Sequence, residues 1–117
     1  MEETLDNKWR FNFVLINRYK DGNDYMGEHR DDEKDLDLNA PIASVSFGET
    51  RDFVLKHKDN RGGRRFRSDL SHVTIALQHG SLLVMHPPTN KCWYHSLPKR
   101  KLAKNPRVNL TFRVMST

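Results

Sequence analysis

Two side chains that can bind a metal ion, His29 and Asp31, lie two residues apart. In an extended strand such residues point to the same face, so the imidazole and the carboxylate would reach into one cavity, with Arg30 turned away. A second histidine from elsewhere in the chain would complete a set of two histidines and one carboxylate. Such a set leaves coordination positions open and suits non-haem Fe(II) oxygenases. The pattern is short, and by itself it occurs by chance in many proteins.

Five other histidines could supply the third ligand. His95 lies in a strand-like run, residues 93–97, whereas His79 precedes a glycine and resembles a turn residue. His86 precedes two prolines and resembles the end of a strand. His57 and His72 have charged or polar neighbours, which is typical of a solvated edge. The residues alone leave the choice open.

A second pattern lies near the C-terminus, where polar and apolar residues alternate over 107–114. One face would present four polar side chains: Arg107, Asn109, Thr111 and Arg113. Two arginines facing a core are costly unless they are paired, and a guanidinium binds a carboxylate through two hydrogen bonds. A dicarboxylate ligand would therefore satisfy them. The alternative is an edge strand whose polar face lies in water.

The elements that must position these residues are short β-rich runs, separated by turn residues about every ten positions. In the first run, Asn17 and Tyr19 share a face with the apolar residues before them. Eight strands are expected, at residues 9–19, 28–31, 42–47, 51–58, 73–77, 81–85, 93–97 and 107–114. With little helix, this pattern predicts an all-β core, a jelly roll or double-stranded β-helix.

Length and composition indicate a single domain. The chain has 117 residues, of which 36% are hydrophobic and 30% charged. We expect an acidic N-terminal tail at 1–8 and a core at 9–117. One cysteine excludes an internal disulfide and a cysteine-rich zinc cluster, and a structural zinc site fits the two-histidine, one-carboxylate set less well than iron does. The sequence contains no secretion signal and no membrane-spanning run. A net charge of +5 weakly favours a polyanionic partner such as nucleic acid.

Together these motifs resemble the AlkB family of 2-oxoglutarate-dependent alkylation-repair dioxygenases, whose pattern is HxD, a distal histidine and RxNxTxR-like spacing near the C-terminus. The stretches FNFVLINRYKDG, GEHRDDE, PIASVSFG, WYHSLP and PRVNLTFR are similar to a mammalian DNA-repair member of that family. The resemblance covers nearly the whole chain from Trp9 onward. It therefore also implies a jelly-roll fold.

The resemblance implies a role for each matching position. The Fe(II) ligands would be His29, Asp31 and His95. The residues that hold 2-oxoglutarate would be Asn17, Tyr19, Arg107, Thr111 and Arg113. Asp32 would contact the damaged base, unless it is simply the first residue of an acidic loop. The DNA backbone would meet Lys56, Arg61, Arg64, Lys99, Arg100 and Lys101.

The implied activity is oxidative demethylation of bases such as 1-methyladenine and 3-methylcytosine in single- or double-stranded DNA. Dioxygen and 2-oxoglutarate would be consumed through a ferryl-oxo intermediate, with release of formaldehyde, succinate and carbon dioxide. The resemblance also implies a nuclear monomer. The family's N-terminal lid and finger hairpin have no counterpart in the sequence, which favours unpaired substrates. The alternatives are a catalytically weak nucleic-acid-binding core and a related dioxygenase acting on RNA.

Overall fold

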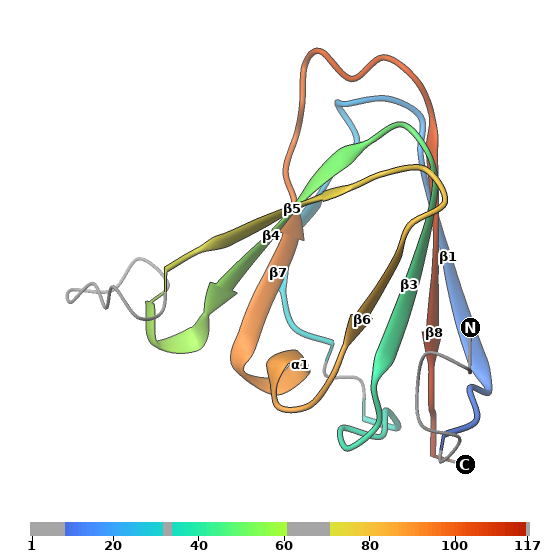
Figure 1. The fold of residues 1–117 in the computed structure, drawn as a ribbon, viewed down its shortest axis with the longest axis vertical. Coiled ribbons are helices and arrows are strands. Elements are labelled where there is room, and N and C mark those ends of the chain that lie inside the picture. The colour runs from blue at the N-terminus through green and yellow to red at the C-terminus, as the bar shows by residue number, and fades with distance from the viewer. Residues whose placement is uncertain (1–8, 32–33, 61–70, 117) are drawn as a thin grey trace.

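The computed structural model describes residues 9–31, 34–60 and 71–116, so the predicted acidic tail at 1–8 lies outside the described residues. Eight strands form two four-stranded antiparallel sheets that face each other (Figure 1). The first sheet has the order β1 (Phe13–Tyr19), β8 (Arg107–Arg113), β3 (Ile42–Gly48) and β6 (Leu82–Met85). The second has the order β2 (Met26–His29), β7 (Trp93–Leu97), β4 (Arg51–His57) and β5 (Val73–Leu77).

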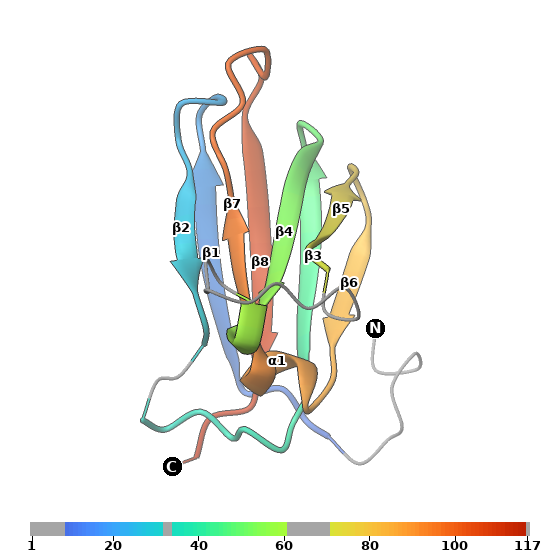
Figure 2. The ribbon, with the colours of Figure 1, turned by 90° about the vertical axis from the view of Figure 1, so that its left-hand side faces the viewer.

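The predicted jelly roll with eight strands and little helix is confirmed. Figure 2 shows β2, β7, β4 and β5 side by side in front of the first sheet. Helical structure among the described residues is limited to the 3-10 turn η2 (Lys58–Asn60) and the one-turn helix α1 (Thr89–Cys92). No helix in that part of the chain is long and apolar enough to cross a membrane.

The core lies between the sheets and takes residues from both. Its buried apolar cluster consists of Tyr19, Leu36, Ile42, Phe53, Leu55, Leu77, Met85 and Leu97. Phe53 and Leu55 alternate with half-buried residues along β4, as expected of a strand with one face on the core. Ile42 is 1% exposed, at the start of β3. These inward faces fix the register on which the polar site depends.

Two strand predictions differ from the structure by more than one residue at an end, and the other six agree to within one residue. The run expected at 9–19 forms a strand only from Phe13, because its pairing partner β8 ends opposite, at Arg113. The strand expected at 28–31 lies at Met26–His29, because its pairing with β7 runs from Met26 to His29. The guanidinium of the next residue, Arg30, lies 4.9 Å from the ring centroid of Tyr94. Arg30 also donates a hydrogen bond to the carbonyl of Lys91 at 2.9 Å. Asp31 therefore follows the strand instead of belonging to it.

The strand β8 decides between the two interpretations of the alternating C-terminal run. It pairs with β1 on one side and with β3 on the other, so it is central and not an edge. Every second residue is buried, and these are the four polar ones: Arg107, Asn109, Thr111 and Arg113. The polar face therefore points between the sheets, and the solvated-edge interpretation is wrong. Such burial is stable only where the polar groups find partners.

Candidate metal centre

The side chains of His29, Asp31 and His95 converge between the sheets. Their potential ligand atoms all lie within 4.8 Å of one another. The Nε2 atom of His29 is 3.7 Å from Oδ1 of Asp31, and Nε2 of His95 is 3.8 Å from Oδ2. His29 and His95 are register partners across β2 and β7, which brings their ring centroids to 4.3 Å. Sheet pairing therefore positions two members, and the segment that directly follows β2 brings in the third.

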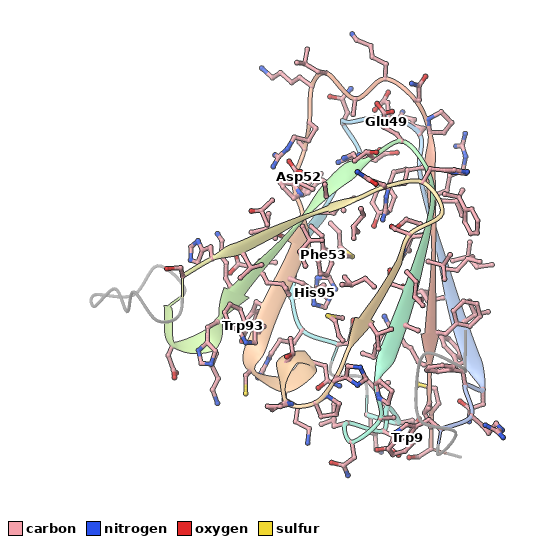
Figure 3. The ribbon with its side chains drawn as sticks, viewed as in Figure 1. Trp9, Glu49, Asp52, Phe53, Trp93 and His95 are labelled. Atoms are coloured by element: carbon pink, nitrogen blue, oxygen red, sulfur yellow. The ribbon has the colours of Figure 1, made fainter. Side chains whose placement is uncertain are left out.

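Neighbouring groups fix the orientation of both imidazoles. The Nδ1 atom of His29 lies 2.7 Å from the carbonyl of Gly27, which accepts a hydrogen bond from Nδ1–H and leaves the lone pair of Nε2 available. The ring of His95 stacks on Phe53, with centroids 5.3 Å apart and planes 28° apart. Figure 3 shows Phe53 and His95 together in the space between the sheets. Both rings are thus held in place before a metal arrives.

The electrostatic surroundings keep His95 neutral. Burial, together with the nearby His29 and Arg113, lowers the pKa of His95 to about 3. A neutral imidazole has a lone pair that can bind a metal, whereas a protonated one does not. Asp31 is 6% exposed and accepts a hydrogen bond from Nη2 of Arg113 at 3.1 Å. The cluster therefore offers two imidazole nitrogens and a carboxylate, a donor set that suits Fe(II) with open positions.

A cavity of about 350 Å³ adjoins the three side chains. The first sheet contributes Leu15, Asn17, Ser44, Asn109, Thr111 and Arg113 to its wall, and β4 contributes Phe53. Apolar and polar groups thus meet in one space, as in most small-molecule sites. Of the five residues predicted to hold 2-oxoglutarate, Asn17, Thr111 and Arg113 line this cavity. Thr111 donates to Oδ1 of Asn109 at 2.8 Å.

The other two predicted residues, Tyr19 and Arg107, lie next to the cavity and not in its wall. They are register partners at the end of β1 and the start of β8, and the Arg107 guanidinium is 5.5 Å from the Tyr19 ring centroid. Arg107 donates from Nη2 to Oγ of Ser46 at 2.7 Å. Its buried Nε has no hydrogen-bond partner among the residues that the structure describes. Tyr19 borders a second hollow, of about 460 Å³, which shares Asn17 and Met26 with the first.

Several residues of the site were given no role by the sequence, among them Asn109, Ser44, Ser46 and Phe53. Asn109 binds Oγ of Ser44 and the carbonyl of Val45 through Nδ2, at 2.7 and 3.1 Å. Ser44 and Ser46 alternate with apolar residues along β3, the same signal that marked the polar face of β8. Phe53 carried no sequence signal beyond its place in an apolar strand. Phe53 contributes to the site by stacking on His95, a contact that depends on how β7 lies against β4.

The basic residues predicted to contact the DNA backbone differ in whether a carboxylate already pairs with them. Nζ of Lys56 pairs with a carboxylate oxygen of Glu28 at 3.2 Å, and Nε of Arg100 pairs with Asp52 at 2.9 Å. Lys99 places Nζ 4.8 Å from the ring centroid of Tyr25. Lys101 is exposed in the loop between β7 and β8. The remaining predicted contacts, Arg61, Arg64 and Asp32, lie outside the described residues.

Comparison with known proteins also indicates an oxygenase that uses Fe(II) and 2-oxoglutarate. The family model described as "2OG-Fe(II) oxygenase superfamily" matches residues 1–113. The DNA oxidative demethylases ALKBH2 of Bos taurus and Mus musculus are 66% and 64% identical over 103 residues, 88% of this chain. ALKBH2 of Arabidopsis thaliana is 46% identical over 91% of the chain. The chain spans only 37%, 43% and 38% of these three proteins, respectively. The match over nearly the whole chain shows that it belongs to the 2OG-Fe(II) oxygenase superfamily, whose members use Fe(II) and 2-oxoglutarate.

Proposed function

We propose that residues 9–117 form the catalytic core of a dioxygenase that removes alkyl groups from DNA bases, with His29, Asp31 and His95 as the Fe(II) ligands. The observation that supports this most strongly is the convergence of these three side chains within 4.8 Å beside a cavity. Their donor set fits the metal that the superfamily uses. When bound, Fe(II) with 2-oxoglutarate and dioxygen supplies the oxidant that hydroxylates the alkyl group.

The residues proposed to hold 2-oxoglutarate are Asn17, Tyr19, Arg107, Thr111 and Arg113. Arg113 lines the cavity and already binds Asp31, so its guanidinium can orient a carboxylate beside the metal ligands. Arg107 is 2% exposed, and no ion pair joins it to a carboxylate of the described residues. A buried cation of this kind is favourable only with an anionic partner. A dicarboxylate co-substrate supplies one, which supports the assignment.

Alkylated DNA is the proposed substrate, since three relatives at 46 to 66% identity are named DNA oxidative demethylases. The exposed Lys99 and Lys101 can add sequence-independent attraction to phosphates. A base must leave its stack to reach His29, which is 36% exposed at the cavity. Asp32 is proposed to contact that base. We propose further that the protein works in the nucleus as a monomer and acts on single- or double-stranded DNA.

An anaerobic titration with Fe(II) and 2-oxoglutarate tests the site. We expect a charge-transfer absorbance band in the wild type that is lost in Asp31→Ala and in His95→Ala. His86→Ala is the matched control, because His86 is exposed and lies outside the three-residue cluster. A band that persists in Asp31→Ala would overturn the ligand assignment. Its persistence in His95→Ala alone would show that another histidine is the third ligand.

Turnover on methylated oligonucleotides tests the substrate. Formaldehyde and succinate are measured together with 1-methyladenine in single-stranded DNA, duplex DNA and RNA. We expect formaldehyde to match succinate and to form faster on DNA than on RNA. Faster turnover on RNA would identify an RNA dioxygenase. Tight DNA binding without formaldehyde would identify a binding core.

A further inference from the structure

The side chain of Arg51, the first residue of β4, forms hydrogen bonds to two loops. It is 2% exposed. Its Nη1 atom donates to the carbonyl of Asp21 at 3.2 Å, and Nη2 donates to the carbonyls of Asp24 and Pro98, both at 2.9 Å. Asp21 and Asp24 belong to the β1–β2 loop, and Pro98 begins the β7–β8 loop, residues 98–106. A planar guanidinium can bind several carbonyls at fixed angles, which an ammonium cannot do.

The same two loops are also bound to each other through Gly22. The Gly22 amide donates to the carbonyl of Ala103 at 2.7 Å, and the Arg100 amide donates to the carbonyl of Gly22 at 2.9 Å. A Cβ atom at position 22 would collide with the carbonyl oxygen of Arg100, so only glycine permits this approach. Figure 2 shows the two loops rising together at the upper end of the molecule. The β7–β8 loop, called the basic loop below because it carries Lys99, Arg100 and Lys101, is thus bound at several points.

Arg51 also reaches the residues proposed to hold 2-oxoglutarate. Its guanidinium carbon is 5.9 Å from the ring centroid of Tyr19, and that of Arg107 is 5.5 Å from the same ring. The Nε atoms of both arginines are buried without a hydrogen-bond partner among the described residues. Burial lowers the pKa of Arg107, and the charge of Arg51 lowers it further because the two cations repel each other, whereas Tyr19 acts in the opposite direction. An anion placed near Arg107 would offset this repulsion.

We propose that Arg51 is a positioning residue that couples the 2-oxoglutarate site to the basic loop at residues 98–106. Without a carboxylate at Arg107, repulsion between the two guanidinium groups weakens the hold of Arg51 on the loop carbonyls. A bound carboxylate relieves the repulsion, so the loop is held firmly and less entropy is lost when it binds a phosphate backbone. The coupling is reciprocal, so nucleic acid strengthens binding of 2-oxoglutarate by the same factor. This inference rests on the proposed function.

The test measures binding and not turnover. Fluorescence anisotropy of a labelled single-stranded oligodeoxynucleotide, under anaerobic conditions with Fe(II), gives its Kd with and without 2-oxoglutarate. In the wild type we expect 2-oxoglutarate to lower that Kd about fivefold, within the usual range of allosteric coupling. Arg51→Lys keeps the charge but loses the fork of donors, and Gly22→Ala separates the loops without changing any charge. Both should reduce the ratio to about one, a loss of about 1 kcal/mol of coupling.

Arg18→Gln is the control, because it removes an exposed arginine of β1 next to Tyr19 and should leave the fivefold ratio intact. Urea unfolding of each variant checks that the fold persists, and Gly22→Ala provides the test if Arg51→Lys does not fold. Ligands that bind the wild type independently would overturn the coupling and leave the proposed function standing. If 2-oxoglutarate lowers the Kd in Arg51→Lys and Gly22→Ala as much as in the wild type, the coupling is likewise overturned and the proposed function still stands. Absence of 2-oxoglutarate binding in the wild type would overturn the proposed function itself.

Discussion

Arg113 and Asp31 form a buried ion pair that connects the two sheets. Nη2 of Arg113 is 3.1 Å from Oδ1 of Asp31, and the two side chains are 5% and 6% exposed. Arg113 ends β8 of the first sheet, whereas Asp31 follows β2 of the second. The other carboxylate oxygen, Oδ2, lies 3.8 Å from Nε2 of His95. One carboxylate thus contacts both the proposed co-substrate arginine and a proposed metal ligand.

Replacing Arg113 with methionine should destabilise the protein by about 3 kcal/mol, because it removes the guanidinium that stabilises the buried Asp31 carboxylate. Urea unfolding with a metal chelator present measures the free energy of unfolding directly. Arg18→Met is the matched control, since Arg18 is exposed on β1, and it should change that free energy by less than about 0.5 kcal/mol. Equal effects of the two substitutions would show that the buried pair has no special role.

The metal-free protein should lose stability as the pH falls below about 6.5. The pKa of His95 is about 3 in the folded protein, below its ordinary value of 6.5. Between these values the unfolded chain binds a proton that the folded chain does not, so acid favours unfolding. Each pH unit in this window costs about 1.4 kcal/mol from this group. Urea unfolding of the wild type and His95→Gln at several pH values, with a chelator, measures the difference.

In His95→Gln that contribution to the pH dependence should disappear, so the two stability curves should converge as the pH falls from 6.5 toward 3. His86→Gln, a change at an exposed histidine, should retain the wild-type slope. A wild-type curve parallel to that of His95→Gln would contradict a low pKa at His95.

The strands could be predicted from the sequence because alternation and turn residues are local signals. The two long-range facts of the site could not be derived in that way. His29 faces His95 because β2 pairs with β7, and the register of that pair is set by tertiary packing, not by either segment alone. The HxD argument assumed that Asp31 extends the strand. In the structure Asp31 reaches the cluster from irregular backbone after the end of β2, where it forms an ion pair with Arg113.

The charge pattern was the least informative part of the sequence. A lysine or arginine is equally basic in sequence whether it is free or paired, and pairing across strands is invisible before the fold is known. Lys56 and Arg100 both pair with carboxylates, from β2 and β4 respectively. The polar face of β8, by contrast, had a local signal, and only the choice between core and solvent needed the structure.

Ser46→Ala should weaken binding of 2-oxoglutarate about tenfold with little change in kcat. Oγ of Ser46 accepts a hydrogen bond from Nη2 of Arg107 at 2.7 Å, and a hydrogen bond to a charged group contributes about 1.5 kcal/mol. The effect should therefore appear in KM for 2-oxoglutarate. Ser81→Ala is the control, because the buried Oγ of Ser81 has no partner among the described residues and its loss should leave KM unchanged. An unchanged KM in Ser46→Ala would remove Arg107 from the co-substrate site.

The salt dependence of DNA binding should distinguish the exposed Lys101 from Lys56, which is paired with Glu28. If Lys101 neutralises a phosphate, Lys101→Gln should reduce the slope of log affinity against log salt for single-stranded DNA by about 0.7. Lys56→Gln should reduce it less, because Glu28 lies 3.2 Å from Nζ of Lys56 and already balances its charge. Glu28→Gln releases Lys56 and should steepen the slope instead. Since the last two variants alter the same ion pair in opposite directions, equal slopes in both would show that Lys56 lies away from the DNA path.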